Sequence, residues 1–597
     1  MAIRVMSENL ANKIAAGEVV EKVVSIVKEL VENSVDAKST DIKVELTESG
    51  LREIKITDNG IGMNKEDAVL AFSRHATSKI YDDDDLFNIN SLGFRGEALP
   101  SIAAVSEVYL TTCYKDDEVG TLVHIKGGKV LDVSESDGRH GTCFKISNLF
   151  YNTPARLKHL SSPYAELSNV IEYMNKMSLS YPNIKFRLIN DSKELLNTSG
   201  DGNLLKIIRN IYGIDVAKRM IKIDNFNDDY KISGYISLPE VTRSSKNHMS
   251  TIVNGRVVKN SFLFKTINDG YSNFKEDTRY PIAVILIETD PSLLDVNIHP
   301  SKMDIKFSNF EDLNNLIKST IIDSIKDKLL IPNITPVHGE VEHKENIQLN
   351  ISRNDSTSTN NYVDLLSAAI NNRVEEDNEL IIDDNEILTD NNESMVETVS
   401  NENKLPELYP VGLLLGTYIV CENEKGIYLI DQHAAKERIN YEHISYVLSH
   451  PGVDTISPMI PIVVEIPMNE LLIIEENKSI LDSLHIEYMI FGNSSIRVTS
   501  HPTWFPEGKE AETISRIIEL IVNKEKNFSL EKFNDNLAKM VSCKMSIKAN
   551  TFIDKASMES LINDLRKCNN PYNCPHGRPS IIHFSIYELE KMFKRSI

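Results

Sequence analysis

The sequence has few cysteines, no long hydrophobic run and fewer basic than acidic residues. Six cysteines in 597 residues, at positions 113, 143, 421, 543, 568 and 574, are too few for a disulfide scaffold and indicate reduced thiols. No segment reaches the ~18 consecutive apolar residues of a membrane span. The N-terminal stretch carries Glu8 and Glu18 and lacks an apolar signal core. We therefore expect a cytoplasmic protein that uses no membrane.

The charge balance and one missing motif exclude two broad classes of protein. The 65 Lys and Arg residues against 87 Asp and Glu give a net charge of −22, so the chain is not a uniformly basic nucleic-acid binder, although a local basic surface is allowed. A Walker A pattern is absent, which excludes P-loop chemistry. Hydrophobic residues make up 41% of the chain, enough for several cores. At ~150 residues per domain, three or four structural units are expected.

One segment is far more acidic than the rest. Residues 337–404 hold 16 acidic and 4 basic side chains, a net charge of −12, with one glycine and no proline. Such a stretch buries too little apolar surface to offset its ordering entropy, so we predict a disordered acidic linker. A poorly patterned acidic helical domain is the alternative. The predicted domains are 1–205, 206–335, the linker 336–405, and 406–597.

A helix with polar residues opposite an apolar stripe is predicted between Glu18 and Val35. The apolar residues recur at helical spacing: Val20, Val23, Val24, Val27, Leu30, Val31 and Val35. Glu29 and Asn33 lie one turn apart on the opposite side. Taken alone, a carboxylate and an amide in these positions most often belong to a solvated face.

Glycine-containing loops follow this helix. A strand over 42–46, a turn at Ser49-Gly50 and a returning strand over 54–58 are predicted, and the second strand ends at Asp58. Asp-Asn-Gly alone is a common hairpin turn. Glycines spaced by two residues leave backbone N–H groups free to approach phosphate oxygens. Such segments are Asp58-Asn-Gly60-Ile-Gly62 and, further along, Gly93-Phe94-Arg95-Gly96-Glu97-Ala98-Leu99.

Taken in order, these motifs resemble the ATPase superfamily of DNA gyrase, heat-shock chaperones, histidine kinases and MutL, the GHKL class. The resemblance is closest to the MutL family of DNA mismatch-repair proteins. It is carried by the stretches Leu10–Val20, Lys28–Ser34, Arg74–Lys79, Leu92–Leu99 and Asn152–Arg156. It implies an α+β multidomain fold with a GHKL ATPase α/β sandwich, a ribosomal-protein-S5-like second domain, the disordered acidic linker, and an α/β C-terminal dimerisation and endonuclease domain.

The resemblance also assigns roles in a nucleotide site, with ATP and Mg²⁺ as the implied cofactors. Glu29 would be the general base that orients the attacking water, and Asn33 would hold Mg²⁺ between the phosphates. Asp58 would accept from the adenine amino group, and Thr142 would support the water around it. Phosphoryl transfer needs mainly positioning and charge compensation. The loop contacts would come from Gly60, Gly62, Thr77, Ser78, Lys79, Gly93, Phe94, Arg95, Gly96, Glu97, Ala98 and Leu99.

Two basic residues of the second predicted domain receive roles in the same way. Lys302 would reach the γ-phosphate, with an ordinary surface lysine as the alternative. Arg256 falls where the family places a contact to the DNA backbone. Residues 206–332 hold 18 basic and 16 acidic side chains, so a sequence-neutral, salt-sensitive groove for double-stranded DNA is expected. Scattered surface charge is the alternative.

The C-terminal body opens with two strand-like runs, 413–420 and 426–430, and Asp431 lies where the second one ends. His433 and Glu437 are four residues apart, so they share one face of the following helix. Alone, such a histidine and carboxylate are usually a surface pair.

Cys574 and His576 stand in a Cys-Pro-His-Gly-Arg-Pro segment near the C-terminus. Together with Asp431, His433 and Glu437 they form a mixed ligand set that suits Zn²⁺ or Mn²⁺ better than Mg²⁺ alone. The set resembles the endonuclease-type MutL proteins, whose signature is Asp-Gln-His-Ala followed by two glutamates. The resemblance implies catalytic roles for Asp431 and Glu437, although the family's Ala-Cys-Arg element reads Ser-Cys-Lys here.

We therefore predict a homodimeric mismatch-repair ATPase that is also a latent metal-dependent nicking endonuclease. The main alternative is an ATP-gated scaffold with a structural metal that recruits other repair enzymes. A type II topoisomerase or a sensor kinase would share only the ATPase half. The implied partners are double-stranded DNA, the mismatch-recognition protein MutS and a sliding clamp. Weak clamp binding is expected, because Ile456 replaces the glutamine of the clamp motif in Ile456–Pro461.

Overall fold

The structure is a computed structural model, and none of its described helices is long and apolar enough to cross a membrane. It describes residues 19–79, 91–93, 96–275, 278–295, 305–329, 405–450, 454–492, 494–524, 529–546 and 551–595. The linker predicted over 336–405 lies outside these residues except for its last one.

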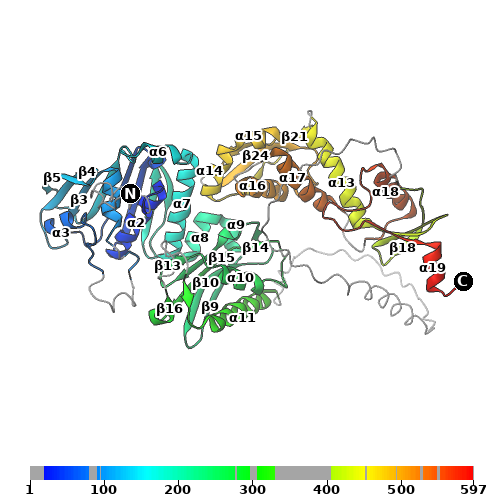
Figure 1. The fold of residues 1–597 in the computed structure, drawn as a ribbon, viewed down its shortest axis with the longest axis horizontal. Helices are drawn as coiled ribbons and strands as arrows, with labels where there is room; N and C mark the ends of the chain where they lie inside the picture. Colours follow the sequence, from blue (N-terminus) through cyan, green and yellow to red (C-terminus); the bar gives the residue numbers. More distant parts are fainter. Residues whose placement is uncertain are drawn as a thin grey trace, which may run out of the picture. The chain divides into compact units, whose positions relative to one another are not determined.

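An eight-stranded sheet forms the first layer of the N-terminal region (Figure 1). Its order is β5-β4-β3-β6-β2-β1-β7-β8, and neighbouring strands are antiparallel except β1 and β7, which are parallel. The predicted strand–turn–strand segment is confirmed as the β1–β2 hairpin, in which Ile42 lies opposite Asp58. The strands are β1 Asp41–Thr47, β2 Glu53–Asp58, β3 Glu107–Cys113, β4 Gly120–Lys126, β5 Lys129–Ser136, β6 Gly141–Ser147, β7 Lys185–Asn190 and β8 Lys193–Asn197.

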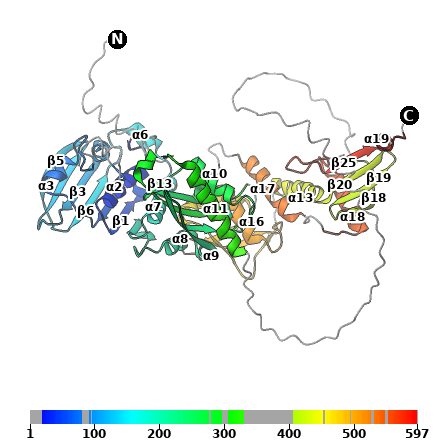
Figure 2. The same cartoon turned by 90° about the horizontal axis from the view of Figure 1, so that it is seen from below.

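Helices α2 (Val23–Asp36) and α7 (Pro163–Ser180) lie against this sheet, as both ribbon views show (Figures 1 and 2). Four residues of the predicted apolar stripe are buried in α2, whereas Val24 and Val35 are only partly buried; the four are Val23, Val27, Leu30 and Val31. Val27, for example, is 0% exposed, and burying such a side chain contributes about 1.5–3 kcal/mol. The helix begins at Val23 rather than Glu18, because its first N–H is satisfied by the Glu166 carboxylate of α7 at 3.2 Å. The other helices here are α3 Lys65–Leu70, α5 Ala98–Val105 and α6 Pro154–His159.

A second, five-stranded sheet follows with the order β13-β12-β15-β10-β9. Strands β12 and β15 are parallel, and the other neighbours are antiparallel. Helices α10 and α11 pack together and share an apolar core with this sheet. The elements are α8 Leu204–Tyr212, α9 Ile214–Lys218, β9 Met220–Phe226, β10 Tyr230–Ser237, β11 Thr242–Arg243, β12 Met249–Val253, β13 Arg256–Val258, α10 Ser261–Gly270, β14 Tyr280–Pro281, β15 Ala283–Thr289, β16 Leu294–Asp295, β17 Lys306–Phe307 and α11 Phe310–Leu329.

The C-terminal region contains two four-stranded sheets and seven helices among its described residues. One sheet has the order β18-β19-β20-β25; in the other, β24 pairs with β21, β22 and β23. The elements are β18 Tyr409–Leu414, β19 Tyr418–Asn423, β20 Gly426–Asp431, α13 Gln432–Ser449, β21 Thr455–Ile456, β22 Ile462–Glu465, α14 Met468–Glu476, α15 Lys478–Ser483, β23 Glu487–Ile490, β24 Ser495–Pro502, α16 Glu510–Val522, α17 Leu530–Met545, α18 Lys555–Lys567, β25 Ile581–Ser585 and α19 Ile586–Met592.

One strand prediction in this region is wrong. The run 413–420 is not a single strand, because a turn splits it between β18 and β19. Leu415 and Gly416 both have left-handed backbone angles, φ 53° and 61°, which suit a tight hairpin turn. The hydrophobic pattern continued through the turn and concealed it. The predicted fold class, a multidomain mixture of helices and sheets, is confirmed.

Candidate nucleotide site and metal centre

Asp58 ends β2 and is buried beside a glycine loop. The residue is 6% exposed; its Oδ1 accepts from the Gly60 N–H at 2.9 Å, and its Oδ2 lies 2.8 Å from the Ser34 hydroxyl. Burial raises the pKa of Asp58, and these donors oppose the rise. Across the sheet Asp58 pairs with Thr142, whose hydroxyl is 3.2 Å from that of Thr112. This corner offers a buried acceptor to an amino group of a ligand.

Two glycines of the predicted loops lie so close to the backbone of other segments that no side chain would fit. A Cβ added to Gly62, which has φ 70°, would lie 2.0 Å from the Cys113 carbonyl oxygen. A Cβ added to Gly96, with φ 61°, would lie 2.4 Å from the Ala76 carbonyl oxygen. Side chains at these positions would force the loops apart, so the sequence keeps glycine where the backbone is crowded.

The polar face of α2 points to the same region. Glu29, Asn33 and Asp36 occupy positions i, i+4 and i+7, so they share one side of the helix. The Asn33 Oδ1 accepts from the Lys79 ammonium at 3.0 Å, and the same ammonium is 2.5 Å from Asp36 Oδ2. Glu29 is half-buried, and its carboxylate makes no hydrogen bond or ion pair with the described residues. It therefore has a carboxylate available to orient water.

Asp36 was not singled out by the sequence reasoning, although its spacing from Glu29 gives a signal. Its Oδ1 accepts from the Leu92 N–H at 2.9 Å, and its Oδ2 accepts from the Gly93 N–H at 3.2 Å. The structure thus brings Asn33, Lys79 and Gly93 together around this carboxylate.

The other predicted loop residues are described only in part. Thr77 accepts from the Lys79 N–H at 3.2 Å through its hydroxyl, while Glu97 precedes α5, which contains Ala98 and Leu99. Ser78 lies between Thr77 and Lys79 in the same turn. The remaining predicted contacts lie outside the described residues: Phe94, Arg95 and Lys302.

The second site lies where α13 meets the segment around Cys574. Glu437, Cys574 and His576 each offer one ligand atom, and these atoms lie within 4.8 Å of one another. The two Glu437 oxygens are 3.4 Å from His433 Nε2 and 3.5 Å from His576 Nδ1. Glu437 is 5% and Cys574 1% exposed, so a carboxylate and a thiol are buried next to the more exposed imidazoles of His433 and His576. This donor set fits a Zn²⁺-like ion.

Asp431 precedes Glu437 on the same segment and has a structural task of its own. It is the N-cap of α13, and its Oδ1 accepts from the N–H groups of His433 and Ala434 at 2.9 and 3.1 Å. A capping carboxylate satisfies free amides and favours the positive end of the helix. Asp431 is not one of the three residues whose ligand atoms lie within 4.8 Å, so the structure groups the predicted ligands only partly.

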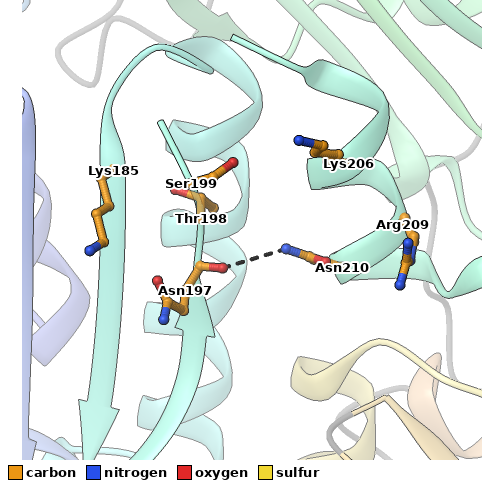
Figure 3. A pocket seen from close by; sticks show the side chains of 7 residues that line it. All are labelled: Lys185, Asn197, Thr198, Ser199, Lys206, Arg209 and Asn210. Atoms are coloured by element: carbon orange, nitrogen blue, oxygen red, sulfur yellow. Dashed lines mark hydrogen bonds between the residues drawn. The ribbon is translucent and has the colours of Figure 1, made fainter. Parts of the chain in front are cut away.

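A basic pocket of about 470 Å³ lies between the edge of the first sheet and α8 (Figure 3). Lys206 and Arg209 project from α8, and Lys185 of β7 also lines the pocket. Lys206 pairs with Asp201 at 2.5 Å, whereas Lys185 and Arg209 have no ion pair within the described residues. The pocket is exposed and offers positive charge away from the nucleotide corner.

Three family profiles match successive parts of the chain. Residues 21–146 match the histidine kinase-, DNA gyrase B- and HSP90-like ATPase family. Residues 208–326 match the C-terminal domain of DNA mismatch repair proteins, and residues 411–552 match the MutL C terminal dimerisation domain. The match to an ATPase family coincides with the Asp58 corner and the polar face of α2.

Curated relatives cover the whole chain. The DNA mismatch repair protein MutL of Anoxybacillus flavithermus is 43% identical over 610 residues, covering 99% of both chains. The protein of the same name from Bacillus anthracis is 42% identical over 625 residues, again with 99% of each covered. Among solved structures, an Aquifex aeolicus MutL ATPase domain complexed with ADP is similar at a TM-score of 0.34 and 22% identity, covering 46% of this chain and 94% of that one. The full-length identity to curated relatives shows that this chain belongs to the MutL family of DNA mismatch repair proteins, with an N-terminal ATPase domain and a C-terminal dimerisation domain.

Proposed function

We propose that the chain hydrolyses ATP at the α2 face and that a metal site at α13 nicks DNA during mismatch repair. ATP would place its adenine amino group at Asp58 and its phosphates along the glycine loops. The glycine approaches, the buried Asp58 acceptor and the open Glu29 carboxylate support this orientation.

The hydrolysis step needs one base and compensation of charge. Water attacks the γ-phosphorus, the bond between that phosphorus and the bridging oxygen breaks, and ADP leaves with the electron pair. Glu29 orients the water and takes its proton. Asn33 would hold Mg²⁺, which neutralises the phosphate charge. Lys302, outside the described residues, stays a predicted contact to the γ-phosphate.

The cluster of Glu437 with His433, Cys574 and His576 is the observation that carries the nuclease proposal. A bound Zn²⁺ or Mn²⁺ would activate water and stabilise the leaving oxygen of a phosphodiester. Glu437 and the two imidazoles would hold the ion, and the exposed side of His576 would face substrate. Asp431 caps the start of α13, so it would orient the helix turn that carries His433. Its carboxylate would lie at the edge of the metal site.

A scaffold with a structural metal is the second candidate, and the burial of Cys574 favours it. This thiol is 1% exposed in a tight turn, where its N–H donates to Arg578 O at 2.8 Å and its carbonyl accepts from Gly577 N–H at 3.0 Å. A ligand so enclosed is typical of a structural zinc site. Nicking of supercoiled plasmid in Mn²⁺ separates the two candidates, since only the nuclease converts it to open circles.

The proposed quaternary state is a homodimer. The sheet of β18, β19, β20 and β25 leaves large apolar side chains in solvent, and contiguous patches of this kind mark interaction surfaces. The C-terminal dimerisation profile covers most of this sheet. The exposed side chains include Tyr409, Val411, Leu414, Leu415, Tyr418 and Ile582.

Double-stranded DNA, MutS and a sliding clamp are the proposed partners. For DNA, the pocket with Lys185 and Arg209 offers basic groups without an ion pair among the described residues, whereas the exposure of Arg256, only 8%, does not support its predicted DNA contact. For the clamp, Met459 and Ile460 are 101% and 84% exposed, so the predicted weak motif is accessible. The basic groups would meet backbone phosphates and make binding salt-dependent.

A further inference from the structure

The turn between β12 and β13 reaches the end of helix α7. Asn254 and Gly255 have left-handed backbone angles, φ 46° and 82°, which make a tight two-residue turn. The Ser180 hydroxyl donates to the Gly255 carbonyl oxygen at 2.8 Å. A Cβ added to Gly255 would lie 2.6 Å from the Tyr181 phenol oxygen. The turn is therefore held closely against α7, and it presents the next residue, Arg256, to the nucleotide side.

Arg256 is buried where a DNA contact would need it exposed. It is 8% exposed, and its Nη2 donates to the carbonyl oxygen of Ser91. Burial lowers the pKa of Arg256, and the carboxylates of Glu32 and Asp36 oppose this by favouring the charged guanidinium. Asp36 is the last residue of α2, where a negative charge is disfavoured by the helix dipole, and Glu32 lies one turn earlier. A buried cation at this point compensates them.

The segment Ser91–Gly93 is consequently held from two sides. Arg256 binds the Ser91 carbonyl, and Asp36 accepts from the N–H groups of Leu92 and Gly93 at 2.9 and 3.2 Å. Hydrogen bonds to charged groups are stronger than those between neutral groups, so three of them over consecutive residues hold this segment in place. Gly93 opens the predicted phosphate loop.

The same carboxylate is tied to the nucleotide site. Asp36 Oδ2 lies 2.5 Å from the Lys79 ammonium, which also donates to Asn33 Oδ1 at 3.0 Å. Under the proposed function, Asn33 turns to nucleotide-bound Mg²⁺ and Lys79 lies near the phosphates. Nucleotide binding then removes an acceptor from Lys79 and changes the charge around Asp36. The change is passed to Ser91–Gly93 and to Arg256.

We propose that Arg256 is a positioning residue that ties the Ser91–Gly93 segment to the β12–β13 turn and so couples the nucleotide site to the second sheet. This inference rests on the proposed ATPase function and names a route by which nucleotide state reaches the second domain. The buried guanidinium acts on the phosphate loop rather than on DNA in this conformation.

The first test uses the full-length, nucleotide-free protein. Hydrogen exchange at the Leu92 and Gly93 amides should be at least about tenfold faster in Arg256→Met than in the parent, because the neighbouring carbonyl loses its anchor. Lys231→Met is the matched control: it removes a positive charge from β10 of the same sheet. Lys231 is exposed, and within the described part of the chain its one ion pair is with the exposed Glu288. Exchange in this control should equal that of the parent.

The second test separates positioning from binding. In Arg256→Met the kcat for ATP should fall about tenfold while KM changes less than threefold, because adenine recognition at Asp58 is untouched. Arg256→Lys keeps the charge and should recover at least half of the lost kcat. If Arg256→Met does not fold, Arg256→Lys serves as the test variant, and its exchange at Leu92 and Gly93 should be about threefold faster than that of the parent.

Unchanged exchange at 92–93 together with a kcat within twofold of the parent would overturn the proposal. A fall in DNA affinity without faster exchange would also overturn the proposal. It would support the earlier prediction that Arg256 contacts the DNA backbone. Failure of the proposed function gives a different result: the parent itself would not hydrolyse ATP, while the exchange difference in the nucleotide-free protein would remain.

Discussion

The Ser34 hydroxyl lies 2.8 Å from Asp58 Oδ2 and 3.0 Å from the Leu30 carbonyl oxygen, so the helix that carries Glu29 is joined directly to Asp58 at the end of β2. The Ser34 hydroxyl has a single hydrogen, so it donates to one of these two oxygens at a time. If the other position holds a donor, the hydroxyl can accept from it. This joint makes Asp58→Asn a clean substitution. The introduced amide can donate to Ser34, which in turn donates to Leu30.

Asp58→Asn should abolish tight ATP binding without weakening the fold. An amide N–H facing the adenine amino group leaves donors unpaired, at a cost of about 1–3 kcal/mol, or roughly ten- to hundredfold in affinity. Isothermal titration with a non-hydrolysable ATP analogue measures the loss. Parent-like affinity would show that adenine is read elsewhere.

The stability of the same variant should depend on pH in a defined direction. Burial raises the folded pKa of Asp58 above 3.8, so its charged form costs stability as pH rises through the folded pKa. The variant lacks that cost and should unfold at the same or a higher temperature than the parent at pH 7. The difference should shrink as pH falls through the raised folded pKa towards 3.8, because Asp58 is then protonated in both states. Thermal melts across this range check it.

Glu29→Ala should stop ATP hydrolysis while ATP binding survives. The carboxylate makes no bond that holds the described structure together, and binding uses Asp58 and the glycine loops. Steady-state phosphate release and analogue binding are measured on the same preparation. A hydrolysis rate within about tenfold of the parent's would show that Glu29 is not the general base.

Two substitutions of Asp431 should separate its capping role from its catalytic role. Asn also caps helices well, whereas Ala loses the bonds to His433 and Ala434 at about 1 kcal/mol. Both variants should lose nicking and keep ATP turnover, but only Asp431→Ala should show lowered stability in denaturant unfolding. Equal stability of the two variants would contradict the capping account.

Arg209→Glu should weaken binding to double-stranded DNA and reduce its salt dependence. Arg209 faces the open basic pocket and has no ion pair within the described part of the chain. Losing one phosphate contact should lower the slope of log affinity against log salt by about one. Lys193→Glu, an exposed change on β8 outside the pocket, is the control. Equal effects of the two variants would point to net charge alone.

The sequence was sufficient for features with a strong period or a fixed spacing. The valine-rich stripe predicted α2, alternation predicted β1 and β2, and the four-residue spacing of His433 and Glu437 predicted their shared face. It was insufficient where a turn carried apolar residues, as at Leu415, and where a contact depends on tertiary packing. The burial of Arg256 against Ser91 has no local signal, because the two residues are 165 positions apart.

Plasmid nicking by the full chain tests the central claim, that the α13 cluster is a nuclease coupled to an ATPase, most directly. Supercoiled plasmid is incubated with Mn²⁺ with and without ATP, using the parent, Asp431→Asn and Glu29→Ala. We predict open circles with the parent, none with Asp431→Asn, and nicking with Glu29→Ala that no longer responds to ATP turnover. Nicking by Asp431→Asn at the parent rate, or none by the parent in Mn²⁺, would contradict the account and favour the scaffold.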